Sequence, residues 1–342
     1  MKILLVTDAW HPQVNGVVRT WTVMCALLTA WGHEVRVIEP GGARTIGAPS
    51  EPTLRLCINP GRHFRRQLGA FQPDAVHIAT EGPLGLAARR HALRHGWRFT
   101  TSFHTMFPDY LKVRMGVPAR WSWAFMRWFH KPSQRVLVPT RNIADVLSVR
   151  GLKNLQVWAR GVDLAAFAPD LPAPPELAHL PRPVWLNVGR VAREKNLDAF
   201  LALKLPGTKV VVGSGPEDRR LREQYPDVLF VGPRRHAELP PYYAAADAFV
   251  FPSQTDTFGL VMLEAMACGT PVAALPADAP REVVREGVTG CLDADLAAAC
   301  LRAAQLPRGS VREGVQAFTW DAIAQQLLDA LCGVSTVQFR AS

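Results

Sequence analysis

Residues 249–272, FVFPSQTDTFGLVMLEAMACGTPV, contain the pattern of a strand, a loop, a helix and a second strand. The apolar residues 249–251 predict a buried strand, and the polar residues that follow predict a loop. A helix is expected to begin near Gly259 and to end at Gly269, because glycine commonly follows the last helical turn. Such a β-loop-α-β unit is the building block of a parallel sheet covered by helices.

The same alternation recurs in both halves of the chain. Strands are expected at 3–6, 34–38, 75–78, 99–103 and 135–138, and then at 184–188, 209–212, 229–231, 248–251 and 271–274. Each is followed by a segment with room for a crossover helix. The pattern predicts the α/β class: two Rossmann-like, doubly wound parallel sheets that face each other across a cleft.

A proline cluster at 169–175 marks the expected domain boundary, because neither a helix nor a central strand tolerates it. We expect an N-terminal Rossmann-like domain over 1–170 and a C-terminal Rossmann-like domain over 171–318. Residues 319–342 are expected to form a closing helix, capped by Thr319, that packs back on the N-terminal domain. Two domains of this size suit a chain of 342 residues.

The net charge of +10 is unevenly distributed. Residues 1–170 hold 22 Lys and Arg against 10 Asp and Glu, whereas residues 171–342 hold 17 against 19. The basic half predicts an acidic partner, which is nucleic acid, an anionic membrane surface or a phosphorylated substrate. No apolar run reaches the ~18 residues of a membrane-spanning helix. The six scattered cysteines indicate reduced core residues of a cytoplasmic protein.

The loop before Gly259 carries groups that suit a sugar or a phosphate. The amides from Thr257 to Leu260 are expected at a helix N-terminus, where unpaired donors and the helix dipole favour an anion. Asp256 precedes that terminus and Glu264 lies about one turn inside it, which places the two carboxylates within ~10 Å of each other. Carboxylates accept hydrogen bonds from vicinal hydroxyls. The alternative is an N-capping aspartate and a solvated helix glutamate.

Two cations follow the predicted strand at 184–188. Arg190 comes directly after the strand and Lys195 begins the next helical segment, so both are expected at the carboxyl edge of the sheet. A planar guanidinium and a point-charge ammonium suit a leaving diphosphate. The alternative is a pair of surface cations in a loop.

Three further strand ends are candidates for binding. Gly16, in the loop after the first strand, lets the backbone approach a phosphate closely. His104 lies just past another strand and is placed to bind a sugar hydroxyl or an acceptor, although a lone histidine is more often structural. Glu81 follows a third strand and suggests a similar role.

Several other chemistries lack their motifs. The glycine turn at 212–216, VGSGP, departs from the dinucleotide pattern GxGxxG, so a nicotinamide cofactor is not expected. Asp293 and Asp295 form the only D-x-D, but they lie away from the strand-end loops, so no metal site is expected. The chain contains no GxSxG, HExxH or P-loop sequence.

Residues 112–131 interleave aromatic and basic side chains. The aromatic residues are Trp121, Trp123, Phe125, Trp128 and Phe129, and the basic residues are Lys112, Arg114, Arg120, Arg127 and Lys131. Indole rings and aliphatic stems suit the headgroup level of a bilayer. Together with Arg62, Arg65 and Arg66, the segment predicts membrane contact, and core packing of the aromatic stripe is the alternative.

Four of these segments, at 7–19, 102–110, 189–196 and 256–271, occur together in one order. In that order they resemble glycosyltransferase family 4, a retaining family of the GT-B fold, over nearly the whole chain. Within the family the sequence is similar to bacterial α-mannosyltransferases and to glucosyl- or sulfoquinovosyl-diacylglycerol synthases. The family usually carries Glu-x7-Glu, and this chain has Asp256 at the first position.

The resemblance implies that the domain over 1–170 binds the acceptor and that the domain over 171–318 binds the nucleotide-sugar. It also implies a role for each matching residue. Glu264 is implied to bind the donor ribose, Arg190 and Lys195 the diphosphate, and Arg234 the base. The implied donor-binding set is Gly16, Arg190, Lys195, Arg234, Asp256, Phe258, Gly259, Leu260 and Glu264, and the implied catalytic set is His104, Asp256, Arg190 and Lys195. Within these sets Asp256 and the neighbouring amides touch the sugar, and Gly16 meets the donor from the other domain.

The implied activity is retaining transfer of a hexosyl unit from a UDP- or GDP-sugar to an acceptor hydroxyl, without cofactor or metal. The implied acceptor is a membrane lipid or glycolipid, and the expected location is the inner face of the cell membrane, with no nucleic-acid partner. The alternatives are a nucleotide-sugar epimerase of the same fold and a non-catalytic basic protein that binds membranes or nucleic acid.

Overall fold

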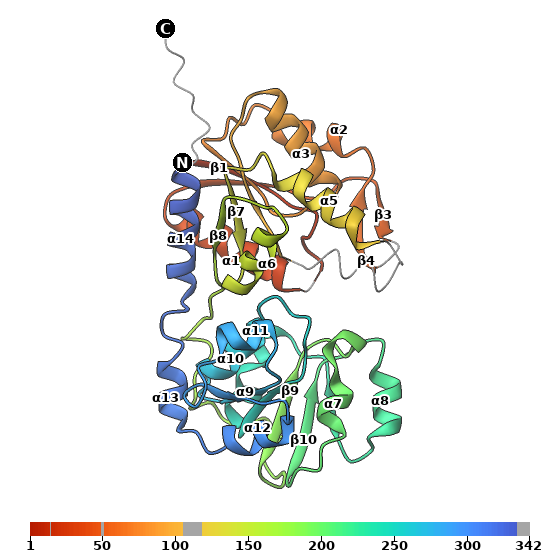
Figure 1. Cartoon of the computed structure of the whole chain (residues 1–342), viewed down its shortest axis with the longest axis vertical. Coiled ribbons are helices and arrows are strands. Elements are labelled where there is room, and N and C mark those ends of the chain that lie inside the picture. The colour runs from red at the N-terminus through yellow and green to blue at the C-terminus, as the bar shows by residue number, and fades with distance from the viewer. Residues whose placement is uncertain (14, 49–50, 105–117, 334–342) are drawn as a thin grey trace. The chain divides into compact units, whose positions relative to one another are not determined.

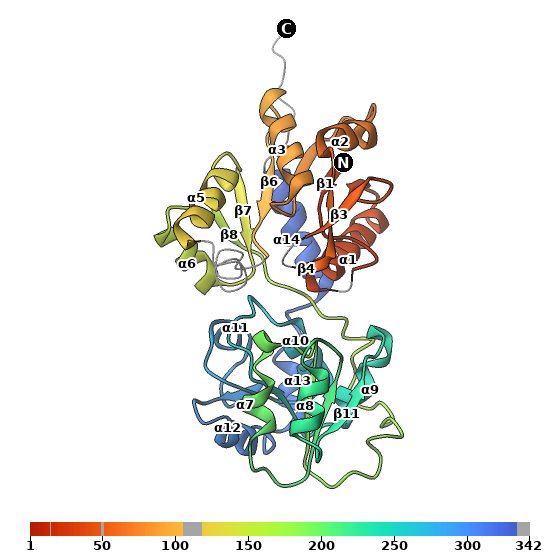
Figure 2. The same ribbon diagram turned by 90° about the vertical axis from the view of Figure 1, so that its right-hand side faces the viewer.

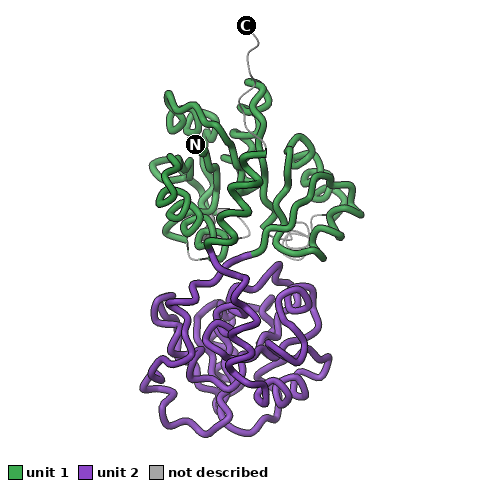
Figure 3. Tube along the Cα trace, turned by 90° about the vertical axis from the view of Figure 1, so that its left-hand side faces the viewer, with its two compact units in different colours: residues 1–159, 321–342 green, residues 160–320 purple. Residues whose placement is uncertain are grey.

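The computed structural model describes residues 1–13, 15–48, 51–104 and 118–333. The chain divides into two compact units, coloured separately in Figure 3. The first unit comprises residues 1–159 and 321–342, and the second comprises residues 160–320.

The first unit is built on a six-stranded parallel sheet of order β2-β1-β5-β6-β7-β8. Its strands are β1 (Lys2–Val6), β2 (Glu34–Ile38), β5 (Ala75–Ile78), β6 (Thr100–Ser102), β7 (Arg135–Val138) and β8 (Leu155–Val157). The strand order reverses between β1 and β5, where Val6 lies opposite both Ile38 and Ile78. The sequence did not indicate β8 or the antiparallel hairpin of β3 (Thr45–Ala48) and β4 (Glu51–Cys57).

Helices cover this sheet, and one of them, α14, comes from the C-terminal part of the chain. They are α1 (Gly16–Ala30), α2 (Pro60–Leu68), α3 (Pro83–Arg94), α5 (Ala119–His130), α6 (Arg141–Val149) and α14 (Trp320–Cys332). Figures 1 and 2 show α14, at the blue end of the colour scale, within the fold of the first unit. The buried indole of Trp158 fixes this helix by donating from Nε1 to the carbonyl of Ile323 at 3.0 Å.

The second unit repeats the plan with the order β11-β10-β9-β12-β13-β14, again all parallel. Its strands are β9 (Val184–Val188), β10 (Thr208–Val212), β11 (Leu229–Gly232), β12 (Ala248–Phe251), β13 (Val272–Ala274) and β14 (Gly290–Leu292). The order reverses between β9 and β12, the place in open α/β sheets where ligands bind. The predicted fold class is therefore confirmed, although β14 was not predicted.

Short helices cover both faces of the second sheet. They are η1 (Arg193–Lys195), α7 (Leu197–Leu201), α8 (Asp218–Gln224), η2 (His236–Glu238), α9 (Pro240–Ala245), α10 (Leu260–Ala267), α11 (Asp278–Val283), α12 (Leu296–Ala303) and α13 (Arg308–Glu313). Phe200, Leu221 and Leu296, from α7, α8 and α12, pack in one buried cluster with Trp185 and Val250. On α9, the ring of Tyr243 packs against Phe249 at 5.6 Å. Near-continuous burial of β9 and β12 follows from this two-sided cover.

The division between the units falls at residues 159 and 160, before the proline cluster at 169–175. Val162 forms a parallel bridge with Thr319, and Arg312 donates to the carbonyls of Leu164 at 2.8 Å and Phe167 at 2.7 Å. These bonds attach residues 162–167, which precede the proline cluster, to the second unit. Among the described helices, none combines the length and the apolar character that crossing a membrane requires.

Candidate functional site

The N-terminus of α10 is the centre of the candidate site. Gly259 stands at its N-cap with φ of 80°, and a Cβ there would lie 2.8 Å from Cε of Met262. Because the N-cap residue is glycine, it supplies no side-chain cap to this helix. In the first unit, by contrast, Asn15 caps α1 by accepting from the amides of Val17 and Val18, both at 3.0 Å. The N-cap residue of α10 thus brings no acceptor of its own to the helix amides, and anion binding at Phe258, Gly259 and Leu260 stays a prediction.

An ion pair joins two predicted site residues at this terminus. Nζ of Lys195 donates to Oδ1 of Asp256 at 2.6 Å, and both side chains are partly buried. The loops that carry them are tied together, since Nδ2 of Asn196 donates to the carbonyl of Pro252 at 3.1 Å. Oδ2 of Asp256 is buried and has no hydrogen-bond partner among the described residues. A buried acceptor without a donor is costly, and a ligand hydroxyl would satisfy it.

Arg190 lies directly after β9, as predicted, and forms an ion pair with Glu194. The side chain of Arg190 is 39% exposed. The turn after β10 packs tightly on the turn after β9, because a Cβ on Gly213 would lie 1.8 Å from the carbonyl oxygen of Gly189. The glycines of the VGSGP turn thus serve backbone packing.

Glu264 is 5% exposed, so the alternative of a solvated helix glutamate is wrong. Nε2 of His236 lies 2.7 Å from its Oε1, and the hydroxyl of Tyr243 donates to its Oε2 at 2.9 Å. Sequence reasoning did not single out His236 or Tyr243. One signal for His236 was available, since it follows the strand β11 by four residues and lies just after the predicted base-contact segment 232–234.

Arg234 lies in that same segment but is engaged elsewhere. Its Nη2 donates to Oε1 of Glu176 at 2.7 Å and its Nε to the hydroxyl of Tyr242 at 2.8 Å. The hydrogen bond to Glu176 raises the pKa of Arg234 above its usual value. The structure therefore joins Arg234 to the proline-rich segment, and the base contact implied by the resemblance stays a prediction.

In the first unit, His104 follows β6 as expected and receives a hydrogen bond from Nε1 of Trp21 to its Nε2 at 3.0 Å. The neutral imidazole then carries its proton on Nδ1, which is a donor. The ring of Trp21 also packs on His77 at 4.5 Å. Burial lowers the pKa of His77 to about 3, so this supporting histidine stays neutral. Gly16 is the first residue of α1, next to the Asn15 cap.

The chain matches known families over both units. Residues 14–166 match the model described as Glycosyltransferase Family 4, and residues 182–305 match the model described as Glycosyl transferases group 1. A GDP-mannose-dependent alpha-mannosyltransferase of Mycobacterium tuberculosis is 33% identical over 319 residues, covering 85% of this chain and 83% of that protein. The chain belongs to glycosyltransferase family 4.

Two further similarities agree with this family. An alpha-monoglucosyldiacylglycerol synthase of Streptococcus pneumoniae is 28% identical over 344 residues, which are 89% of this chain and 78% of that protein. The solved sucrose-phosphate synthase of Thermosynechococcus elongatus superposes with a TM-score of 0.76 at 23% identity, covering 97% of this chain and 98% of that one. The protein is a nucleotide-sugar-dependent glycosyltransferase of the GT-B fold, and the similarities do not support the epimerase or non-catalytic alternatives.

Several acidic residues of the glycosyltransferase have structural partners. Oε1 of Glu81 lies 3.2 Å from Nε2 of the buried His130. Asp295 caps α12 by accepting from Ala297 at 3.0 Å, and Asp293 pairs with Arg302 at 3.3 Å, so the D-x-D stabilises this helix end. Within the described ranges, no group of three or more His, Cys, Asp or Glu is arranged to hold a metal ion.

Asp8 is a buried acid of the glycosyltransferase that the sequence did not reveal. Its Oδ1 accepts from the amide of Leu84 at 2.8 Å and its Oδ2 from that of Gly85 at 3.2 Å, at the start of α3. Burial nevertheless raises the pKa of Asp8 to about 6. Asp8 therefore links the end of β1 to α3 as a titratable cap.

The aromatic and basic segment is divided between core and surface. On α5, Trp123, Met126 and Phe129 are buried, whereas Trp121 is 64% and Trp128 50% exposed. Core packing thus accounts for one part of the stripe and leaves two indoles on the surface. Lys112 and Arg114 lie outside the described residues. The six cysteines are free, and Cys332 is exposed, so the expectation that all six are core residues is wrong.

Proposed function

We propose that this glycosyltransferase transfers mannose from GDP-mannose, with retention of configuration, to a hydroxyl of a lipid or glycolipid acceptor. The observation that carries the proposal is the Lys195–Asp256 pair, with the buried Oδ2 of Asp256 unpartnered among the described residues, beside the start of α10 with glycine at its N-cap. Those groups match the sugar and diphosphate parts of such a donor. The mannose and the guanine are suggested by the name of the M. tuberculosis relative.

The diphosphate is assigned to the two cations and the helix start. Arg190 would bind phosphate oxygens with its planar fork, and Lys195 would bind as a point charge. The amides of Phe258, Gly259 and Leu260 would add donors at the positive end of the helix dipole. These charges stabilise the leaving diphosphate as negative charge develops on it.

The carboxylates are assigned to the hydroxyls of the donor. Oδ2 of Asp256 would accept from a hydroxyl of the sugar, while Oδ1 stays on Lys195. Glu264 would accept from the two ribose hydroxyls, because it is a buried carboxylate at the first turns of the same helix. His104 would contact a sugar hydroxyl.

The proposed reaction needs no protein nucleophile. The bond from the anomeric carbon to the diphosphate oxygen breaks, and the acceptor oxygen forms a new bond to that carbon on the same face. The acceptor proton passes to the departing diphosphate oxygen. Since Arg190 and Lys195 neutralise the leaving group in this scheme, it also needs no metal ion.

A thermal-shift panel of GDP, UDP, GDP-mannose and UDP-glucose tests the donor. Ligand at 100 times its dissociation constant stabilises a fold by about 2.7 kcal/mol. We expect a shift with GDP and GDP-mannose that Glu264→Ala removes, and mannosyl transfer that survives EDTA. A shift with UDP ligands alone would reassign the donor, and indifference to every nucleotide would refute the proposal.

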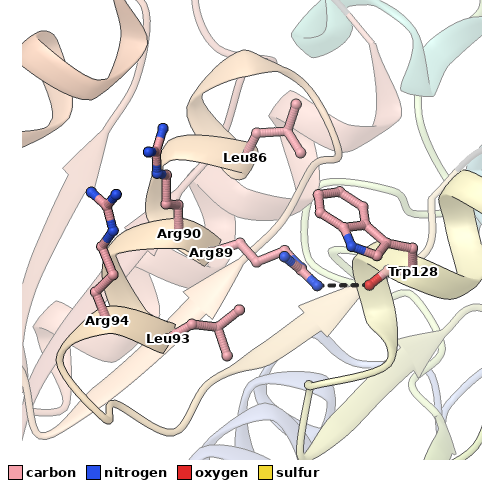
Figure 4. Close-up of a pocket in the computed structure, with 6 residues that line it drawn as sticks. All are labelled: Leu86, Arg89, Arg90, Leu93, Arg94 and Trp128. Carbon is pink, nitrogen blue, oxygen red and sulfur yellow. Dashed lines mark hydrogen bonds between the residues drawn. The ribbon is translucent and has the colours of Figure 1, made fainter.

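The acceptor side of the proposal includes contact with an anionic membrane at the inner face of the cell membrane. A hollow of about 470 Å³ between α3 and α5 is lined by Leu86, Arg89, Arg90, Leu93, Arg94 and Trp128, as Figure 4 shows. Arg89 stacks on the Trp128 ring at 3.9 Å and donates to its carbonyl at 2.8 Å. Neither α3 nor α5 contains an acidic residue.

This combination suits phosphate headgroups and the acyl chains beneath them, since arginine binds phosphate and indole lies at the interface. The diacylglycerol in the name of the S. pneumoniae relative supports a lipid acceptor. Vesicle sedimentation tests the contact. We expect binding to phosphatidylglycerol vesicles but weakly to phosphatidylcholine, with loss in Trp121→Ser/Trp128→Ser and retention in Trp31→Ser, an exposed tryptophan of the same unit.

Equal binding of the wild type to phosphatidylglycerol and phosphatidylcholine vesicles would contradict recognition of an anionic surface. Salt-sensitive binding of nucleic acid without binding to vesicles would point to the other class of acidic partner.

A further inference from the structure

The carboxylate of Glu264 is held at both oxygens. The His236 imidazole contacts Oε1 at 2.7 Å, and the Tyr243 hydroxyl contacts Oε2 at 2.9 Å. A carboxylate offers about four lone-pair sites, and these two contacts, one at each oxygen, orient it. Accepting from two neighbouring ribose hydroxyls requires that both oxygens be fixed in direction.

The position of His236 is itself well determined. It is the first residue of η2, and the turn is closed by the Arg235 amide, which donates to Glu238 at 2.7 Å. The imidazole packs against the ring of Phe167 at 5.1 Å with an interplanar angle of 60°. Phe167 is 1% exposed, and its carbonyl accepts from Arg312. The imidazole of His236 therefore packs on the buried ring of Phe167, which fixes its position.

The three members of this group differ in exposure. The side chain of Glu264 is 6% exposed and Tyr243 is fully buried, whereas the side chain of His236 is 33% exposed. His236 therefore forms the solvent-facing side of the group. The hydrogen bond from His236 narrows the range of the terminal torsion of Glu264, because such torsions have broad energy wells.

We propose that His236 is a positioning residue for the nucleoside part of the donor, which orients the Glu264 carboxylate toward the ribose hydroxyls. The proposal rests on the proposed role of Glu264. Ribose contacts are the same before and during sugar transfer, so their loss weakens donor binding without slowing the chemical step. Loss of His236 should thus raise the donor KM and leave kcat nearly unchanged.

The test compares His236→Phe, which keeps a ring but removes the hydrogen bond, with His236→Gln, which keeps an N–H donor. His179→Phe is the matched control, because His179 is exposed in the same unit. Calorimetric titration with GDP and UDP gives the affinity, and transfer from GDP-mannose gives KM and kcat. We expect affinity and KM to worsen about 10- to 100-fold in His236→Phe, the range for a hydrogen bond to a charged group. His236→Gln should restore most of this loss.

A double variant tests whether His236 acts on nucleotide binding through Glu264 or independently of it. His236→Phe added to Glu264→Gln should weaken binding no further than Glu264→Gln alone, since the two residues act as one unit. Unchanged KM in His236→Phe, or a loss of kcat alone, would overturn the positioning role. If Glu264→Gln weakens nucleotide binding but His236→Phe does not, this inference fails and the proposed function stands. If the wild type binds neither nucleotide, both fail.

Discussion

The two units share a sheet plan but treat their strand-end loops differently. In the first unit, the loops are closed by the protein's own side chains: Asn15 caps α1 and Asp8 caps α3. In the second unit, the N-cap residue of α10 is Gly259, which supplies no side-chain cap, and the Lys195–Asp256 pair lies in the loops before the helix. The contrast teaches that a βα turn with a polar side chain beside the helix amides supplies its own cap, whereas a turn with glycine at the N-cap supplies none from that residue. In the proposed function, the second kind of turn binds the donor diphosphate.

The largest effect is expected where charge neutralises the leaving group. Lys195→Ala should lower kcat/KM about 1,000-fold, because it removes a cation from the diphosphate and leaves Asp256 without its partner. Steady-state transfer assays measure the effect. Arg193→Ala, which removes an exposed cation two residues earlier, is the control and should change kcat/KM little. Equal losses in both variants would contradict a specific role for Lys195.

The next largest effect is the pH dependence of the unfolding free energy, and it arises from Asp8 in the first unit. The pKa of Asp8 is raised from 3.8 to about 6, so its contribution to stability is complete below pH 3.8 and is lost as pH rises through 6. At 1.36 kcal/mol for each pH unit, the loss is about 3 kcal/mol. Asp8→Asn should remove this part of the pH dependence in urea unfolding between pH 4 and 7. Parallel stability curves for wild type and variant would refute it.

A smaller effect is expected from the charge of Asp256. Asp256→Asn weakens the bond to Lys195 and offers a weaker acceptor to the sugar, so kcat/KM should fall about 10-fold. Asp256→Glu introduces the residue that the family usually carries and should retain more activity than Asp256→Asn. Measuring both variants with GDP-mannose decides the point. Full activity of Asp256→Asn would show that its charge is not used.

The smallest effect is expected from a helix cap that lies outside the site. Asp295→Ala should cost about 1 kcal/mol of unfolding free energy and lower the Tm by about 2–4 °C. Activity should be the same as in wild type, with or without EDTA, because Asp295 caps α12. Activity that falls and responds to added divalent metal would contradict this assignment.

Much of the fold could be predicted from the sequence because local pattern and tertiary role agree. The apolar runs at 184–188 and 248–251 are buried on both faces, so continuous hydrophobicity identified β9 and β12. The sequence did not reveal β14, which has only 3 residues. It did not reveal the β3–β4 hairpin either, because these two strands contain no continuous apolar run. Residues 160–170 were expected in the first domain but belong to the second unit. Arg312 and Thr319, which are distant in sequence, bind that segment there.

The candidate site divides in the same way. The sequence by itself determined that Arg190, Lys195, Asp256 and Glu264 follow strands or begin a helix, because parallel strands end at one edge of a sheet. Only the tertiary structure decided that Lys195 pairs with Asp256, that Arg234 pairs with Glu176, and that His236 and Tyr243 hold Glu264. These partners lie up to 61 residues apart in sequence. Their contacts depend on how the loops fold over one sheet edge, which local sequence pattern does not encode.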